Sequence, residues 1–148
     1  MRCSLLDAFI ERRTRRHAIA CAAALVFTRS GRAASHLDPK WYEAAAAMKR
    51  LAQSWGDQPY GAVVVVDGRL TGEGPSRVVK HQDSTAHAER EAIRDAQRRL
   101  GRTRLQGAVL YSTSRPCSLC EAAAAEAGVS RMYFGPALTD AGTPGKGL

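Results

Sequence analysis

The 148-residue chain has few cysteines and no long apolar run, and each shortage excludes a class of protein. Of its four cysteines, Cys3 and Cys21 lie in the first 35 residues, which leaves only Cys117 and Cys120 beyond them. Two thiols cannot form the disulfide framework that holds many small secreted domains together. The apolar run at 18–27 has ten residues, whereas a membrane-spanning helix needs about 20. We therefore expect no permanent membrane anchor.

Internal repeats and low-complexity linkers are absent as well, and the length suits one domain with a single hydrophobic core. The charge is distributed unevenly along the chain. Residues 1–35 carry seven basic and two acidic residues, and the remainder carries 15 basic and 12 acidic residues, so the net charge of +8 divides into +5 and +3. The modest +3 of residues 36–148 argues against a nucleic-acid partner.

Residues 1–35 resemble a cleavable export signal. The basic run at 12–16 is followed by the apolar run at 18–27 and then by small residues. Residues 14–19, TRRHAI, resemble the twin-arginine export signal. We therefore expect an export signal at 1–35, a functional domain at 36–148, and a periplasmic or exported protein. If the segment is instead a basic helix or a misplaced start, the protein is cytoplasmic.

The functional domain begins with a predicted helix. Asp38 and Pro39 are typical of a helix start, because an N-cap acid is followed by proline at the first helical position. Beyond them, apolar residues recur three and four positions apart, as expected for one buried face of a helix over 38–55. The predicted face consists of Trp41, Ala44, Met48, Leu51 and Trp55.

The rest of the domain alternates between strands and helices. A β-branched run at 60–66, the turn pair Asp67-Gly68 and a second run at 69–73 predict an antiparallel hairpin, and the first run favours a strand covered on both faces. The later patterns predict a helix at 86–100, a strand at 107–112, a helix at 117–127, a strand at 129–134 and a loop at 135–148. Because strand-helix-strand connections give a parallel section, we predict an α/β fold with a mixed sheet and helices on its faces.

Two short motifs stand at predicted helix starts. His87-Ala88-Glu89 opens one helix, and Pro116-Cys117-Ser118-Leu119-Cys120 opens the next. Each follows a loop or strand that brings its helix start to one sheet edge, so the two starts can face each other. His87, Cys117 and Cys120 then form a three-ligand zinc set that leaves a fourth tetrahedral position for water. The partial positive charge of a helix N-terminus favours thiolates at such a position.

Glu89 supplies the proton chemistry that such a zinc centre needs. Zinc lowers the pKa of bound water to about 7, and Glu89 is close enough to His87 to take the released proton and pass it to a ring nitrogen and a leaving amine. H-x-E alone is a weak pattern, and C-x-x-C alone is shared with redox proteins. Together, in this order, they match the zinc deaminase signature. The motifs therefore predict a hydrolytic deaminase that releases ammonia.

Longer segments resemble one branch of that family. Residues 83–94, DSTAHAEREAIR, resemble the D-P-T-A-H-A-E-x-x-A-I-R segment of guanine deaminases and bacterial tRNA adenosine deaminases. Residues 59–63, PYGAV, resemble their P-F-G-A-V strand, while 110–111 and 139–141 resemble their L-Y strand and T-D-A turn. The chain is thus similar to the cytidine deaminase-like zinc deaminases over about 41–142.

The resemblance implies a three-layer α/β/α sandwich of the cytidine deaminase-like type, a zinc cofactor and a homodimer. It places Gly61 and Ala62 against the bound base, with Tyr60, Ser76 and Arg115 as further candidates for substrate contact. The implied substrate is a nucleobase, nucleoside or nucleotide, and a purine such as guanine is favoured. A tRNA adenosine deaminase is the near alternative, against which the charge of +3 and the expected export both argue.

Departures from the family pattern bear on the substrate. Ser76 stands two residues after the Gly72-Glu73-Gly74 segment, where relatives have asparagine, and Ser84 replaces a proline. Arg115 stands where the family commonly has glutamate, and this charge reversal favours an anionic or phosphorylated substrate. The chain stops at Leu148, where relatives continue into another helix. We therefore expect a shortened C-terminal region, with a neighbouring subunit closing the site, an open pocket, or lost activity.

A non-enzymatic C-x-x-C module is the rival from another class of protein. A structural zinc site would need a fourth protein ligand, and only His36 or His81 remains for it outside residues 1–35. A redox dithiol would need neither His87 nor Glu89. Both alternatives predict a protein without deaminase activity.

Overall fold

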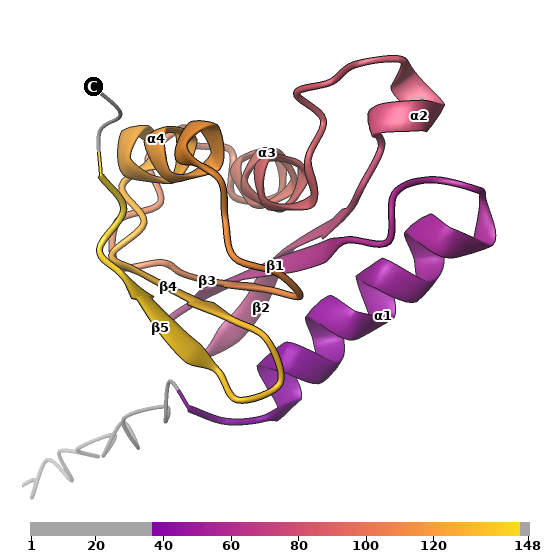
Figure 1. Ribbon diagram of the computed structural model, residues 1–148. Helices are drawn as coiled ribbons and strands as arrows, with labels where there is room; N and C mark the ends of the chain where they lie inside the picture. The colour runs from indigo at the N-terminus through magenta and orange to yellow at the C-terminus, as the bar shows by residue number, and fades with distance from the viewer. Residues whose placement is uncertain (1–36, 146–148) are drawn as a thin grey trace, which may run out of the picture. The chain divides into compact units, whose positions relative to one another are not determined.

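A computed structural model describes residues 37–145 of the chain (Figure 1). The elements in this range are α1 (Lys40–Ser54), β1 (Gly61–Val66), β2 (Arg69–Pro75), α2 (Val78–His81), α3 (Ala88–Leu100), β3 (Val109–Ser112), α4 (Ser118–Ala127), β4 (Arg131–Phe134) and β5 (Thr139–Gly142). These strands form one sheet in the order β2-β1-β3-β4-β5. β3 and β4 run parallel, and the other neighbouring pairs run antiparallel. The predicted mixed sheet is therefore confirmed.

Helices cover both faces of the sheet (Figure 1): α1 lies on one face, and α3 and α4 lie on the other. β1 supplies both interior layers, because alternate residues of a strand point to opposite faces. Ala62 and Val64 pack with α3 and α4, whereas Val63 and Val65 pack with Trp41 of α1. All residues of β1 are buried, as its apolar run predicts. The predicted three-layer α/β/α sandwich is confirmed.

α3 approaches β2 so closely that only glycine fits beneath it. A Cβ atom at Gly72 would lie 2.2 Å from the carbonyl oxygen of Ala92, and a Cβ atom at Gly74 would lie 2.1 Å from that of Ala88. We call these four residues the glycine–alanine seam. His87 is the N-cap of α3 and directly precedes Ala88. The seam therefore fixes where the motif side chains at the start of α3 stand.

α1 packs on β1 through a face that differs in part from the predicted one. Mostly small side chains form the buried face, which consists of Trp41, Ala45 and Ala52. Leu51, predicted to be buried, is 40% exposed, and the other predicted positions beyond Trp41 are partly buried. The reason is the approach at Gly61, where a Cβ atom would lie 2.2 Å from the carbonyl oxygen of Ala45. Contact at that distance selects alanine over leucine.

The sequence patterns miss two short elements. β5 lies in the segment predicted as a loop, and it pairs with β4, where Arg131 forms an ion pair with Asp140 across the two strands. α2 has four residues, and the carboxylate of Asp57 accepts hydrogen bonds from the backbone N–H groups of Val79 and Lys80. Each element depends on a partner outside itself, so local periodicity does not reveal it. β2 also continues to Pro75, beyond its predicted end at residue 73.

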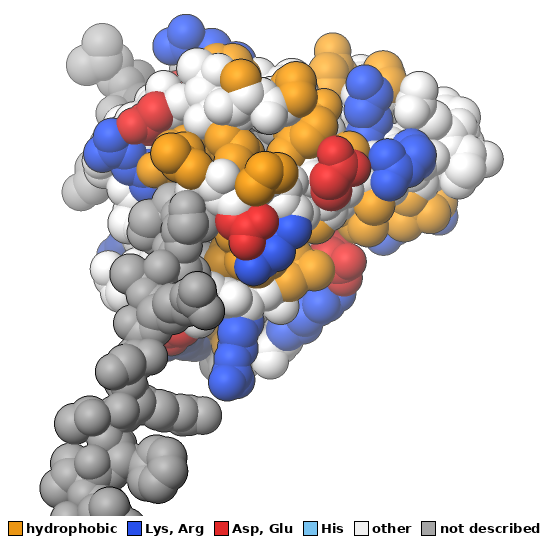
Figure 2. All heavy atoms as spheres, turned by 90° about the horizontal axis from the view of Figure 1, so that it is seen from below, with side chains coloured by type: hydrophobic (Ala, Val, Ile, Leu, Met, Phe, Trp, Pro, Cys, Tyr) orange, Lys and Arg blue, Asp and Glu red, His pale blue; other side chains and the backbone are white. Residues whose placement is uncertain are grey.

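The surface on the α1 side carries charges of both signs, and neither sign dominates it (Figure 2). Acidic and basic side chains are interspersed there among exposed hydrophobic side chains, over the part of this face that Figure 2 shows in colour. Within residues 37–145, no helix is long and apolar enough to cross a membrane. The export signal predicted at 1–35 lies outside the described residues.

Gly74→Ala tests the glycine–alanine seam. The added methyl group would overlap the backbone of α3, so the helix must move or β2 must distort, and overpacking of this kind costs roughly 1–3 kcal/mol or more. We expect a lower free energy of unfolding in urea than for the wild-type protein. Gly145→Ala is the matched control, because a Cβ atom there meets nothing within 4 Å. Equal stability of the two variants would contradict the close contact.

Candidate active site

The two motifs meet where α3 and α4 begin. His87 is the N-cap of α3, and Cys117 is the N-cap of α4. The Nδ1 atom of His87 lies 3.6 Å from Sγ of Cys117 and 3.5 Å from Sγ of Cys120. The three donor atoms all lie within 4.8 Å of one another, and no other group of three potential ligands occurs within residues 37–145. The structure thus brings the three predicted ligands together.

The spacing of these donor atoms fits zinc. Tetrahedral zinc, with Zn–N near 2.0–2.1 Å and Zn–S near 2.3 Å, separates a ligand nitrogen from a ligand sulfur by about 3.6 Å. The observed separations are 3.5 and 3.6 Å. Three protein ligands leave one position open, which is typical of a catalytic rather than a structural zinc site. His81, one of the two histidines that the structural-zinc alternative leaves for a fourth ligand, does not join the group, and His36 lies outside the described residues.

Glu89 stands beside the ligand set. Its Oε2 atom accepts a hydrogen bond from the Cys120 thiol at 3.5 Å, and the residue is only 5% exposed. Burial raises the pKa of Glu89 above its usual range, against the opposing effects of its backbone N–H, the Cys120 thiol, the charge of His87 and the Ser112 hydroxyl. A buried carboxyl group with a raised pKa can accept and return a proton closer to neutral pH than an exposed one.

Cys120 is almost fully buried, and this burial, followed by the charge of Glu89, raises the pKa of its thiol. The helix start favours the thiolate on sequence grounds, whereas burial favours the neutral thiol. A metal ligand must be deprotonated, so zinc has to displace the Cys120 proton when it binds.

A hollow of about 250 Å³ opens beside the ligand set. Drug-sized molecules occupy pockets of roughly 300–1,000 Å³, so this hollow suits a smaller molecule such as a single base. Its lining comes from the segment before β1, the start of α3 and the loop between β3 and α4, and consists of Gln58, Tyr60, His87, Ala88, Glu89, Ser114, Arg115 and Cys117. Tyr60 and Arg115, both predicted from the sequence as substrate contacts, therefore lie at this pocket.

The other predicted substrate contacts lie outside this lining. Gly61 packs against α1, and its N–H group donates to Oγ1 of Thr113 at 3.1 Å. Ala62 is buried in the cluster beneath α3 and α4. Ser76 is fully buried, and its Oγ donates to Oδ1 of Asp57 at 2.9 Å. Contact of these three residues with a substrate stays a prediction.

Sequence reasoning missed Gln58 and Ser114 as pocket residues. Gln58 precedes the strand segment 59–63, and Ser114 lies in the loop before Pro116. Neither residue takes part in a recognisable spacing pattern. Each residue lies next to a motif that reaches the pocket, which is the one feature of the sequence that points to it. Such proximity does not show which neighbouring side chain lines the pocket.

Asp57 connects the pocket wall to α2. Its carboxylate accepts hydrogen bonds from the Ser76 hydroxyl and from the backbone N–H groups of Gln58, Val79 and Lys80. Burial raises the pKa of Asp57, but these hydrogen bonds outweigh burial and hold the pKa below its usual range. The stability that the ionised form contributes is fully present above the unfolded pKa of about 3.9 and is lost as the pH falls through the lower folded pKa.

The sequence at 35–136 matches the family model described as the cytidine and deoxycytidylate deaminase zinc-binding region. This match covers more than half of the chain and contains both motifs, so the chain belongs to this family of zinc-dependent deaminases. The match, together with the three-ligand group, confirms the zinc cofactor that the motifs predict.

The similar proteins include both tRNA adenosine deaminases and a guanine deaminase, which are the two activities that the sequence patterns leave open. A tRNA-specific adenosine deaminase from Agrobacterium fabrum is 43% identical over 93 residues, which cover 63% of this chain and 61% of that protein. A guanine deaminase from Bacillus subtilis is 39% identical over 87 residues, which cover 59% of this chain and 56% of that protein. The chain therefore spans less than two thirds of the length of either relative.

A solved structure from a study of A-to-I editing by tRNA:A34 deaminases is similar to this chain with a TM-score of 0.64 and 41% identity, covering 66% of this chain and 71% of that one. The likeness supports the sandwich fold and the family assignment. It does not favour guanine over an RNA adenosine as the substrate.

Ser76→Ala distinguishes a structural role of this hydroxyl from a role in ligand contact. Loss of a buried hydrogen bond to a charged carboxylate costs about 1–3 kcal/mol, so we expect a matching fall in the free energy of unfolding in urea at pH 7. Ser54→Ala is the control, because the Ser54 hydroxyl is exposed and bonds only within its own helix turn. If Ser76→Ala is as stable as the wild-type protein, the bond to Asp57 contributes nothing and the hydroxyl is available for a ligand.

Proposed function

We propose that this protein catalyses the zinc-dependent hydrolytic deamination of a purine base. The observation that carries the proposal is the position of Glu89, whose Oε2 lies 3.5 Å from Cys120 beside the three-ligand set and which lines the same base-sized pocket as His87. A structural zinc site has no use for a buried carboxyl group with a raised pKa at an open coordination position. The same arrangement provides three ligands for a metal, a carboxyl group that can carry protons, and room for one ring.

The residues divide the work of the reaction. His87, Cys117 and Cys120 would hold the metal, and zinc bound there lowers the pKa of a coordinated water to about 7, which supplies a nucleophile near neutral pH. Glu89 would carry two protons in turn at Oε2: it takes the first from the attacking water and gives it to a ring nitrogen, then takes the second from the hydroxyl group now on the ring carbon and gives it to the departing amine as the C–N bond breaks. Its burial keeps bulk water away from the proton in transit. The products are the carbonyl-bearing base and ammonia.

Within this proposal we place adenosine in RNA first among the purine substrates. The Agrobacterium tRNA-specific enzyme and the tRNA:A34 deaminase structure share 43% and 41% identity with the chain, against 39% for the Bacillus guanine deaminase. Arg115 is exposed at the pocket, where a positive charge can contact a phosphate attached to the reacting nucleoside. Guanine stays the second candidate, supported by its own relative.

The cellular location bears on the choice between these two substrates. An exported enzyme does not meet cellular RNA, so the export signal predicted at 1–35 and an RNA substrate exclude each other. Export would fit a free purine such as guanine, whereas retention in the cytoplasm leaves both substrates open.

Metal content and ammonia release, measured on the same full-length sample, test the proposal. We expect one zinc per chain and ammonia from one of three substrates: guanine, adenosine, or an adenosine-bearing RNA stem-loop. Glu89→Gln should keep its zinc and lose about 10²–10⁴ of the rate, because it removes proton transfer alone. Cys117→Ala should lose both the metal and the activity. Light scattering of the same sample shows whether the chain forms the homodimer that we propose.

Zinc without turnover of any of the three substrates would contradict the deaminase proposal while leaving the metal centre intact. Absence of zinc together with reagent-accessible thiols would instead support the redox dithiol.

Fractionation of cells expressing the full chain tests the location. If residues 1–35 are an export signal, the protein is recovered outside the cytoplasm with this segment removed, as intact mass spectrometry shows. Substitution of the pair Arg15 and Arg16 by lysine should then keep the protein inside the cell. A full-length protein found only in the cytoplasm would rule out export and leave RNA open as the substrate.

A further inference from the structure

Basic residues concentrate along α3 and the loop that follows it. Six of the 15 lysine and arginine residues beyond position 35 lie within 90–104. Five of them line two adjoining hollows of about 830 and 340 Å³, which share residues of α3 and of the loop that leads to β3. We call this surface the arginine groove, and its basic residues are Arg90, Arg94, Arg98, Arg102 and Arg104.

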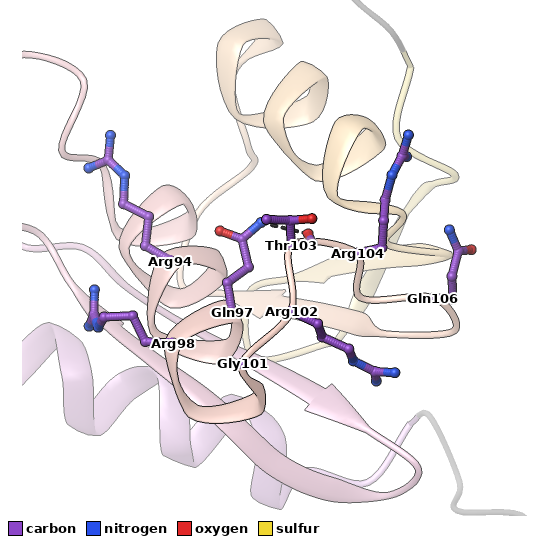
Figure 3. A pocket seen from close by; sticks show the side chains of 8 residues that line it. All are labelled: Arg94, Gln97, Arg98, Gly101, Arg102, Thr103, Arg104 and Gln106. Atoms are coloured by element: carbon purple, nitrogen blue, oxygen red, sulfur yellow. Dashed lines mark hydrogen bonds between the residues drawn. The ribbon is translucent and has the colours of Figure 1, made fainter.

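The fold brings these side chains together from two segments. Arg90, Arg94 and Arg98 follow each other at intervals of four residues, so they share one face of α3. α3 ends at Gly101, whose left-handed backbone turns the chain back, and Arg102 and Arg104 then follow in the returning loop. In Figure 3 Gln97 of α3 and Thr103 of the loop meet, while the side chains of Arg94 and Arg98 extend to one side of them and those of Arg102 and Arg104 extend to the other.

Hydrogen bonds hold the two sides of the groove in place. The Nε2 atom of Gln97 donates to the carbonyl oxygen of Thr103 at 2.8 Å, which ties α3 to the loop (Figure 3). Nη1 of Arg104 donates to the carbonyl oxygen of Glu126 at 2.8 Å, which ties the loop to α4. These two bonds link α3, the loop and α4 at the arginine groove.

The groove keeps positive charge after its internal ion pairs are counted. Arg94 pairs with Glu91, and Arg98 pairs with Asp95, each through one guanidinium nitrogen. A guanidinium group has five N–H donors, so both arginines retain donors for a further anion. Arg90 and Arg102 form no ion pair with any residue in the described range. The carboxylates at the groove, including that of Glu126, number fewer than the arginines.

We propose that the arginine groove binds the phosphodiester backbone of RNA. Guanidinium groups bind phosphate oxygens in a bidentate manner. The lining contains no aromatic side chain on which a base could stack, so the groove contacts backbone rather than bases. A single phosphate needs one or two converging cations, whereas here three arginines extend over about 12 Å of helix, at 1.5 Å per residue.

The groove begins next to the metal centre. Arg90 follows His87 by three residues, which is less than one helical turn and about 4.5 Å of rise. A strand lying along the groove thus has one end near the pocket that contains Glu89. This inference rests on the RNA form of the proposed function, because it assigns the groove to the part of the substrate that does not react.

Binding can be measured without catalysis. The probe is a fluorescein-labelled RNA stem-loop, titrated with full-length, zinc-loaded Glu89→Gln protein at several salt concentrations and followed by anisotropy. The test variant adds Arg98→Gln and Arg102→Gln, two exposed groove residues that hold no other part of the structure except the pair with Asp95. The matched control adds Arg50→Gln and Arg69→Gln, which remove the same charge from α1 and from the β1–β2 hairpin.

We expect the groove variant to bind at least about fivefold more weakly, with a slope of log Kd against log salt that is smaller by about 1.4–1.8, since each lost phosphate contact accounts for about 0.7–0.9. The control should keep most of the affinity and the slope. In the background with Glu89 intact, the groove variant should deaminate free guanine or adenosine at the rate of the wild-type protein, because the groove does not contact the reacting base.

Equal weakening of the groove variant and the control would overturn the proposal, since it would show attraction by overall charge alone. No binding of RNA by the parent protein would also overturn it and would leave an acidic protein surface as the occupant to examine. These results are separable from the deaminase proposal: RNA binding without ammonia release supports the groove and contradicts the activity, whereas ammonia release from guanine without RNA binding does the reverse.

Discussion

The contact between the backbone of α3 and β2 is the constraint on which the active site depends. Gly72 and Gly74 have no side chain, so the backbone of α3 at Ala88 and Ala92 packs directly on β2. The space between them is too small for a methyl group. A helix held this deeply has no freedom to slide or rotate. Its first residues then project from one fixed point at the edge of the sheet, which is why a histidine and a glutamate two positions apart reach the same site.

Charge at the metal centre is balanced against burial. Burial raises the pKa of both Glu89 and Cys120, so the protein alone disfavours negative charge at these two side chains. A divalent cation held by His87, Cys117 and Cys120 would supply the compensating charge. Ionisation of the ligands would then be coupled to the binding of metal, and the proposed function assigns the exchange of protons in the pocket to Glu89.

The small net charge of residues 36–148 conceals a local concentration of arginine. The value of +3 over residues 36–148 is small, and the face that carries α1 mixes both signs (Figure 2). Arginine is nevertheless concentrated along α3 and the loop after it, where ion pairs with Glu91 and Asp95 neutralise only part of the charge. A local surplus of this kind governs binding of a polyanion more than the total does, because charge interactions are screened within about 8–10 Å at physiological salt.

The sequence by itself determined the elements whose signals are local. Apolar periodicity gives α1 and α3, and an apolar run gives the covered strand β1. H-x-E followed by P-C-x-x-C picks out the three potential zinc ligands that the fold brings together, because ligand chemistry restricts the residue types. Only the tertiary structure decided what depends on distant partners. The close approach of α1 at Gly61 buries alanine residues of this helix and leaves Leu51 exposed. The short helix α2 depends on hydrogen bonds to Asp57. Strand β5 depends on its pairing with β4. Burial raises the pKa of the Cys120 thiol, whereas the helix start alone predicts a lowered one. The turn at Gly101 places arginines of α3 and of the following loop on one surface. Neither effect can be read from the sequence, because distances and desolvation exist only once the chain has folded.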